Sequence, residues 1–528
     1  MRISLSPVLA SLVLAFGAAP AAAQVVPSEF RGHERQVLTV VEVQGLTVAD
    51  LPELAPEGAI GLMVPSAGPE TSGALAFSGM VRGVLHNARL GPRPDGPVLI
   101  HVEKSLVIPP LKDAIIVGLP PGQPTPNDRR YPIAVLGPCH GVLTSSLTRV
   151  RGLVSIADVA RTALQSPHAL ACSRDGNAVA TLERLEQRIE TARSTTMLGT
   201  VIVMAIAGLL ALFLPGATLA ALAAALGANL ALGFVPLGGV AMRLTLLGVL
   251  MLAGGIAGRR LFRDPLTAGA VLTGLVATYG VAMAAWPAAL SLAPLSPELT
   301  SRFYGVSNLV ETLLLVPVIA GTALLARRYG WPAFAACAAL ALLTVSENRL
   351  GDDGGGALVL AGTFAVLAVL MCGGGIRALA LGVLGAGVVV FGLLYVDAAV
   401  SGPDHLRGAF DGGVSGLASV AAHRIPLSYA RVAEQWYLVF PLGAVAVLLL
   451  RSWRTEPSRD RRAILAAFGT ALLASLLVND SPGPVALGGL AAFVALAPFA
   501  VRNELAAARR ALAAKGLQPA FSRSSPDP

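Results

Sequence analysis

From residue 197 to residue 501 the chain alternates between long apolar segments and short polar links. A helix needs roughly 17–25 predominantly apolar residues to cross a bilayer. Eleven segments approach or reach that length, and we expect each of them to span a membrane. They cover residues 197–214, 216–233, 239–257, 265–285, 306–325, 331–346, 355–371, 377–396, 437–450, 463–478 and 484–501. The pattern predicts an α-helical polytopic membrane bundle of about 11 helices over residues 196–502.

Arginines occupy every second link between these segments. The links hold Arg259, Arg260 and Arg263, then Arg327 and Arg328, then Arg377, then Arg451 through Arg462. The basic tail, 503–528, falls in the same phase. Because positive residues concentrate in cytoplasmic links, we expect these links and the C-terminus to lie in the cytoplasm.

The first 23 residues have the composition of a secretory signal peptide. Met1 and Arg2 give a positive start, Leu5 to Ala18 is apolar, and Ala21-Ala22-Ala23 offers a small-residue cleavage site. An uncleaved membrane anchor is the alternative reading. Cleavage would leave residues 24–195 outside the cytoplasm, and eleven crossings would then end inside, as the arginines require.

The composition is typical of a membrane protein. Hydrophobic residues make up 54% of the chain and charged residues 13%, which excludes an ordinary soluble enzyme of this size. The net charge of +8 resides largely in the cytoplasmic links. We therefore expect membrane lipid as a partner, with anionic headgroups meeting the arginines, and no nucleic acid.

Residues 24–195 are numerous enough for one domain with its own core. Runs of apolar and β-branched residues predict strands at 37–43, 60–64, 97–102 and 131–136. Helical spacing of the apolar residues predicts helices at 72–90 and 156–164. An amphipathic helix at 178–193 leads to the first span, and the Pro-rich segment 109–130 reads as a surface loop. The pattern predicts an extracytoplasmic α/β domain.

Four cysteines divide between the two regions. Cys337 and Cys372 fall in or beside predicted spans, where a thiol behaves as a buried apolar group. Cys139 and Cys172 both fall in the extracytoplasmic segment, where disulfides persist. We expect a Cys139–Cys172 disulfide, with two buried thiols as the alternative.

The extracytoplasmic segment carries a family resemblance. Its elements are Val43-Gln44-Gly45-Leu46, Leu54 to Gly61, Leu136-Gly137-Pro138-Cys139-His140-Gly141, and Gly152 to Thr162. Together they resemble a shortened member of the alkaline phosphatase and sulfatase superfamily. That family places a metal-binding Asp after the first strand, a Ser or Thr nucleophile after the next strand, and a late Asp-His-Gly.

The resemblance implies the fold more strongly than the chemistry. Gln44 stands where the first metal ligand would be, and Cys139 replaces the acid of Asp-His-Gly, so His140 is the one evident ligand counterpart. Ser66, Thr71 and Ser72 occupy conceivable nucleophile positions, but each is a weak nucleophile without a metal. We expect a non-catalytic relative that lacks a metallophosphatase centre.

Polar residues gather at the predicted outer face of the membrane region. Ionisable groups at membrane depth are costly and usually mark function. Glu311 lies about one turn inside the fifth segment, with Asn308 on the same helical face. The predicted ligand site comprises Arg302, Tyr304, Asn308, Glu311, Glu347, Asn348, Arg349, Asp352 and Asp353.

The arginines and aspartates of this site can each be interpreted as ligand-binding groups or as structural ones. Arg302 and Arg349 offer planar donors for phosphate or carboxylate, or they pair locally with Glu298 and Glu347. Asp352 and Asp353, beside three glycines, present oxygen ligands for a divalent cation. The same two acids are also suited to cap the seventh helix. We expect no other cofactor.

A second resemblance lies in the membrane region. The run Arg302-Phe303-Tyr304-Gly305-Val306-Ser307-Asn308 and the later Leu-Gly-x-Asp-Gly-Gly-Gly run ending at Gly356 are similar to motifs of bacterial polytopic membrane proteins. Those proteins join an alkaline-phosphatase-like outer domain to a helical bundle. The resemblance implies this architecture and a place in the bacterial cytoplasmic membrane.

Two function classes follow. The first is a cell-envelope protein that binds or processes a lipid-linked or phosphorylated glycan at the outer face of the cytoplasmic membrane. The second is a secondary transporter or flippase, which Asn229 and the Gly-Phe-Val-Pro-Leu-Gly-Gly run 233–239 favour. The sequence holds no nucleotide-binding, zinc-protease or nucleophile-elbow motif, so no enzyme class is assigned.

Overall fold

The computed structural model describes residues 38–500 except 69, 87–99, 101, 106–113, 138, 165–169, 237, 296–302, 348–349, 352, 401–421, 423–432, 434, 457 and 479–481. The predicted signal peptide and the basic tail therefore lie outside the described residues. The chain forms two compact units. The α/β unit comprises residues up to 193 together with 281–292 and 297–305, and the helical unit comprises the remainder.

A mixed β-sheet organises the α/β unit. Its strand order is β10-β8-β2-β7-β5-β1-β4, and β9 also pairs with β2. Strands β5, β1 and β4 are parallel to one another, as are β8, β9 and β2, whereas β7 and β10 run antiparallel to their neighbours. The bounds are β1 Thr39–Val43, β2 Ala59–Val64, β4 Val102–Ser105, β5 Ala114–Val117, β7 Tyr131–Val135, β8 Gly141–Thr144, β9 Leu153–Ser155 and β10 Ala171–Arg174.

Both faces of this sheet are buried, because successive side chains of a strand point to opposite faces. On one face Val40 and Ile115 pack with α3 (Gly73–Arg82) and α4 (Ala157–Ala163). On the other, Val41 and Ile116 pack with α2 (Leu51–Leu54) and the first turns of α5 (Ala178–Phe213). Burial on both faces explains why the central strands β2, β5 and β7 are almost continuously apolar. The edge strands β4 and β10 carry polar side chains.

The interpretation of 109–130 as a surface loop is wrong for its centre. Ala114–Val117 is a strand between β1 and β7, and all four residues are buried. Four apolar residues between Asp113 and Gly118 are too few for periodicity to reveal a strand. The rest of the segment holds β6 (Thr125–Pro126), which pairs with β3 (Glu70–Thr71).

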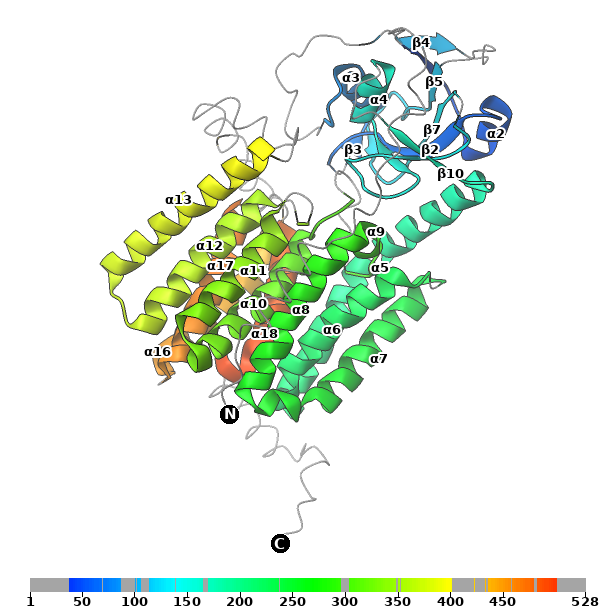
Figure 1. Ribbon diagram of the computed structural model, residues 1–528. Helices are drawn as coiled ribbons and strands as arrows, with labels where there is room; N and C mark the ends of the chain where they lie inside the picture. The colour runs from blue at the N-terminus through cyan, green and yellow to red at the C-terminus, as the bar shows by residue number, and fades with distance from the viewer. Residues whose placement is uncertain are drawn as a thin grey trace. The chain divides into compact units, whose positions relative to one another are not determined.

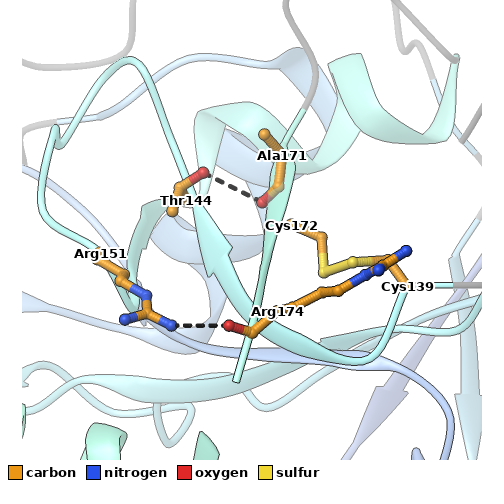
Figure 2. The surroundings of a disulfide bond; sticks show 6 residues. All are labelled: Cys139, Thr144, Arg151, Ala171, Cys172 and Arg174. Atoms are coloured by element: carbon orange, nitrogen blue, oxygen red, sulfur yellow. Dashed lines mark hydrogen bonds between the residues drawn. A yellow bond between two sulfur atoms is a disulfide. The ribbon is translucent and has the colours of Figure 1, made fainter. Parts of the chain in front are cut away.

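A disulfide joins Cys139 to Cys172, with 6.3 Å between the two Cα atoms (Figure 2). It ties the turn before β8 to β10, which is the strand hydrogen-bonded to β8. The Thr144 hydroxyl donates to the Ala171 carbonyl in the same ladder. A cross-link over 33 residues stabilises a fold by about 3–4 kcal/mol in the chain-entropy account.

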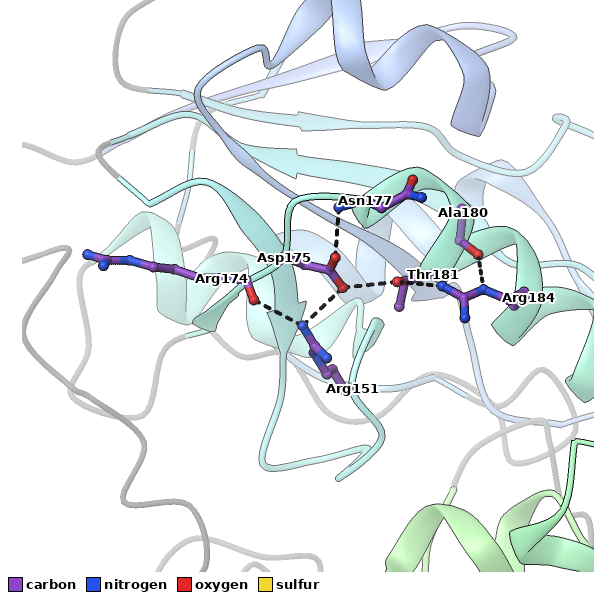
Figure 3. A network of polar contacts seen from close by, with 7 residues as sticks. All are labelled: Arg151, Arg174, Asp175, Asn177, Ala180, Thr181 and Arg184. Atoms are coloured by element: carbon purple, nitrogen blue, oxygen red, sulfur yellow. Dashed lines mark hydrogen bonds and ion pairs between the residues drawn. The ribbon is translucent and has the colours of Figure 1, made fainter.

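One continuous helix, α5, begins at Ala178 and extends for 36 residues. It joins the amphipathic segment 178–193 and the first predicted span, for which the sequence pattern predicts two separate elements. Asp175 anchors the start: its Oδ2 accepts from Thr181 Oγ1 at 2.9 Å and Arg151 Nη2 at 3.0 Å, and its Oδ1 accepts from the Asn177 amide (Figure 3).

Each of the eleven predicted segments is helical. The helices are α5, α6 Thr218–Phe234, α7 Val240–Gly258, α8 Pro265–Ala285, α10 Asn308–Tyr329, α11 Trp331–Ser346, α12 Gly354–Cys372, α13 Ile376–Val400, α16 Val439–Thr455, α17 Arg459–Val478 and α18 Pro482–Ala500. A short α9 (Pro287–Ser291) follows α8. Within the described residues, eight helices are long and apolar enough to cross a membrane, and α11 and α18 are shorter apolar helices.

Apolar side chains cover the outside of the helical unit. Along α13, which packs beside α12 in Figure 1, Ile376, Leu384 and Val388 are 78%, 68% and 74% exposed. Such a surface would be unstable in water but is suited to lipid. The chain is thus a multi-pass membrane protein by helix length, composition and surface.

Candidate functional site

The Glu311 carboxylate lies inside the helical unit, in the first turn of α10. Only 2% of the residue is exposed. A Cβ built on Gly356 would lie 2.5 Å from Glu311 Oε1 and 2.7 Å from Val345 Cγ1. The carboxylate therefore packs directly against the first turn of α12, where only glycine leaves room for it.

Asp353 is the N-cap of α12, and its Oδ1 accepts a hydrogen bond from the Gly356 amide at 2.9 Å. The capping interpretation of this acid is what the structure shows. Two carboxylates, those of Glu311 and Asp353, thus lie at the N-terminus of α12, where the helix dipole favours negative charge.

The divalent cation expected at Asp352 and Asp353 stays a prediction. Asp352 lies outside the described residues. In the part of the chain that the structure describes, no group of three or more His, Cys, Asp or Glu side chains could hold a metal ion.

Asn308 begins α10 and is 7% exposed. Its carbonyl accepts from the Thr312 hydroxyl at 2.6 Å. Glu347 follows the last turn of α11, and its amide donates to the Leu343 carbonyl. The structure thus brings Asn308, Glu311 and Asp353 to one end of α10, α11 and α12, as expected for antiparallel helices with short links.

Tyr304 belongs to the α/β unit instead. The Arg149 guanidinium carbon lies 3.7 Å from the centroid of its ring. The preceding Phe303 is 1% exposed in the core beneath the sheet, and the Arg130 guanidinium lies 5.2 Å from its ring. The predicted ligand site is therefore divided between the two units. Its other members, Arg302, Asn348, Arg349 and Asp352, lie outside the described residues.

The positions that the phosphatase resemblance singled out differ in burial. Gln44 in a turn and His140 in the loop before β8 are both exposed. Ser72 is the N-cap of α3 and accepts from the Leu75 amide at 3.3 Å. Ser66 and Thr71 are buried, and the Asn127 amide nitrogen donates to the Ser66 carbonyl at 2.9 Å. The hydroxyls of Ser66 and Thr71 are therefore enclosed by the packed interior of the α/β unit.

Two buried ionisable groups of the α/β unit, Asp158 and Arg130, are not among the predicted site residues. Burial raises the pKa of Asp158 to about 6, although hydrogen bonds from Ser145 and the Ser155 amide oppose this shift. Burial lowers the pKa of Arg130 to about 10, against the influence of Glu186. Arg130 follows two other charged residues, Asp128 and Arg129, so no local pattern marks it as buried. Asp158 is marked only as the one carboxylate in the largely apolar run 153–160.

The features that favoured transport have structural roles. The Asn229 amide donates to Tyr279 Oη at 3.3 Å, and its carbonyl oxygen accepts from the Leu295 amide at 2.7 Å. Tyr279 in turn donates to the Leu226 carbonyl at 2.9 Å. The run 233–239 coincides with the end of α6 at Phe234 and stops just before α7 begins at Val240. Asn229 therefore fastens a loop between helices.

Comparison with protein-family models, curated proteins and solved structures finds no match. The two resemblances stated from the sequence motifs stay predictions.

Proposed function

We propose that this protein is a cell-envelope protein of the bacterial cytoplasmic membrane that binds or processes a lipid-linked or phosphorylated glycan at the outer face. The observation that supports this most is the burial of the Glu311 carboxylate against Gly356 in the first turn of α12. Ionisable groups buried in a membrane bundle are retained for function by default.

The proposed orientation is supported by which helix ends lie together inside the helical unit. A Cβ on Gly488 of α18 would lie 3.1 Å from Leu309, so α18 and α10 begin at one end. At the opposite end the Thr218 hydroxyl at the start of α6 donates to the Ala495 carbonyl of α18. A Cβ on Gly216 would lie 3.9 Å from Arg259. Arg259 is thus at the end away from Glu311.

The arginines of α10 and α17 agree with this assignment. Arg327, in the last turn of α10, lies 3.5 Å from Asp460, and Arg459 donates to the Leu370 carbonyl near the end of α12. Because positive residues concentrate on the cytoplasmic side, we propose that this end faces the cytoplasm and that the Glu311 end faces out. The proposal has eleven spans, residues 24–195 outside and the C-terminus inside.

The chemistry of the outer end fits a phosphorylated sugar. Carboxylate and amide oxygens of Glu311 and Asn308 accept hydrogen bonds from sugar hydroxyls. Arg302 and Arg349, each two residues in sequence from a described site residue (Tyr304 and Glu347), would supply bidentate donors to phosphate. The α/β unit, with its Cys139–Cys172 disulfide suited to an oxidising compartment, acts as a non-catalytic recognition domain.

Binding of a polyprenyl-diphosphate-linked disaccharide to the full chain in nanodiscs tests the proposal. Replacing Glu311 with Gln removes the charge at nearly constant volume and should weaken binding at least tenfold. The matched control is Glu456→Gln, a carboxylate paired with Arg461 at the cytoplasmic end, which should bind like the parent. No binding by the parent, or equal binding by the Glu311 variant, contradicts the proposal.

A secondary transporter or flippase is the second candidate, because Glu311 is a buried carboxylate among membrane helices. It predicts movement of the same lipid-linked sugar across proteoliposomes, with loss on Glu311→Gln. Binding without movement favours the first function, and movement favours the second.

A further inference from the structure

One peptide unit of a short loop is held from two sides inside the helical unit. The loop comprises Ala293 to Leu295, which belong to the helical unit. The Leu295 amide donates to Asn229 Oδ1 of α6 at 2.7 Å, and the Pro294 carbonyl accepts from Thr195 Oγ1 of α5 at 3.3 Å. This carbonyl and this amide belong to one planar peptide unit and point in opposite directions. Two helices therefore bind both polar groups of a single secondary amide.

Hydrogen bonds behind Asn229 fix the orientation of its side chain. Tyr279 of α8 donates its proton to the Leu226 carbonyl at 2.9 Å, so its oxygen accepts from Asn229 Nδ2 at 3.3 Å. The amide nitrogen of Asn229 is committed to Tyr279, and its amide oxygen is the atom that faces the loop. Thr195, Asn229 and Tyr279 are each 0% exposed. The donor and the acceptor for the peptide unit are thus preorganised in a buried place.

An apolar contact accompanies the two polar groups. Leu295 is 0% exposed. A Cβ built on Gly199 of α5 would lie 3.0 Å from Leu295 Cδ2 and 3.4 Å from Leu247 Cδ2 of α7. Because glycine leaves room there, the Leu295 side chain packs closely against α5. The loop therefore places an amide and an apolar group together among the helices.

A buried cation lies one helical turn from this contact. Arg243 is 0% exposed and begins the buried row of α7 that continues through Leu247, Met251 and Gly255. Residues four apart lie on the same face of a helix, one above the other, so Arg243 is one turn from Leu247. An ionisable group at membrane depth is costly and usually marks function. A guanidinium here is suited to a ligand that carries phosphate beside an amide.

We infer that Thr195 and Asn229 form a binding site for the acetamido group of an N-acetylated, phosphorylated sugar, and that the loop 293–295 occupies this site as an internal plug. An acetamido group offers the same N–H and C=O as the Pro294–Leu295 peptide unit, and its methyl group is suited to the space beside Gly199. The ligand and the plug compete for the same hydrogen bonds, so binding requires the plug to leave. The choice of a phosphorylated sugar rests on the proposed function; the amide site does not.

Two lipids that differ only in the acetamido group test the site. The probes are polyprenyl diphosphate linked to N-acetylglucosamine and the same lipid linked to glucose, each bound to the full chain in nanodiscs. The parent should bind the N-acetylated lipid at least about tenfold more tightly, because the glucose hydroxyl cannot pair with both Thr195 and Asn229. Asn229→Leu should abolish this preference. The matched control is Leu222→Ala, which truncates a buried leucine of the same helix and should keep the preference.

Variants of Leu295 test the plug. Leu295→Ala removes the buried side chain and enlarges the fraction of open molecules, so the affinity for the N-acetylated lipid should rise by about tenfold. Leu295→Cys, in a Cys372→Ser background that leaves only buried Cys337 as a native thiol, should react faster with a maleimide when the N-acetylated lipid is added. The glucose lipid should not accelerate this reaction. A loop with a purely structural role predicts weaker binding of both lipids by Leu295→Ala.

The outcomes separate this inference from the proposed function. Equal affinity of the parent for the two lipids, or weaker binding by Leu295→Ala, would overturn the inference and leave the function standing. A preference for the N-acetylated lipid that Glu311→Gln leaves at full strength would refute the role of Glu311 and support the amide site. Failure of both lipids to bind the parent and Leu295→Ala would refute both proposals.

Discussion

Phe303→Ala should destabilise the α/β unit severely, although Phe303 lies more than 100 residues beyond the predicted end of that domain. Its side chain is 1% exposed in a core that includes Leu51, Leu62 and Leu182. Truncation of a buried phenylalanine costs about 3–5 kcal/mol through lost burial and the cavity left behind. The ring also covers Arg130, which is 7% exposed, so we expect the upper part of this range.

Pulse proteolysis in urea, applied to the full chain in nanodiscs, reports the unfolding free energy of the α/β unit. The control is Phe213→Ala, because Phe213 is 42% exposed at the end of α5 and should leave the unit unchanged. A loss below about 1 kcal/mol for Phe303→Ala would refute the reasoning. It would mean that the α/β unit forms its core without the Phe303 ring.

Three further changes have defined outcomes. Cys139→Ser with Cys172→Ser should lower the unfolding free energy by about 3–4 kcal/mol, and reductant should lower the parent equally and the variant not at all. Burial raises the pKa of Asp158 from 3.8 to about 6, so the folded protein favours the protonated carboxyl. The resulting contribution to the free energy of unfolding is fully present below pH 3.8 and is lost as the pH rises through 6. This loss is roughly 3 kcal/mol. Asp158→Asn keeps an acceptor for Ser145 but does not ionise, so its free energy of unfolding should rise relative to that of the parent between about pH 4 and pH 7. Parallel plots of the two unfolding free energies against pH would contradict this. Gly356→Ala should lower the melting temperature and displace Glu311, whereas Gly362→Ala, whose Cβ would meet nothing within 4 Å, should not; equal melting would show that the carboxylate has room.

The helices were predictable because long apolar runs determine helix position locally. All eleven segments are helical, and the separate amphipathic segment merged with the first span because no Gly or Pro interrupts Ala178–Phe213 before Gly199. The capping role of Asp353 could also be predicted, because Asp is a preferred N-cap residue and Asp353 directly precedes a predicted helix. These features depend on residues within one or two turns.

The placement of Phe303 and Tyr304 could not be read from the sequence. Their partners, Arg130 and Arg149, are more than 150 residues earlier in the chain, and nothing local distinguishes an aromatic residue packed on a distant domain from one lining a ligand site. The strand β5 was missed for a different reason, since four apolar residues show no period. Glu311 was found because a charge inside an apolar run is conspicuous at any distance from its partners.

The most direct test of the account is which side of the membrane the Glu311 end occupies. Glu347→Cys, near that end, should react with a membrane-impermeant maleimide in intact cells. Native Cys372, exposed near the end of α12, should react only after permeabilisation, with Cys372→Ser as its control and Cys337 buried. Labelling of Cys372 in intact cells together with protection of the cysteine at 347 would place Glu311 on the cytoplasmic side and contradict the proposed outer-face site.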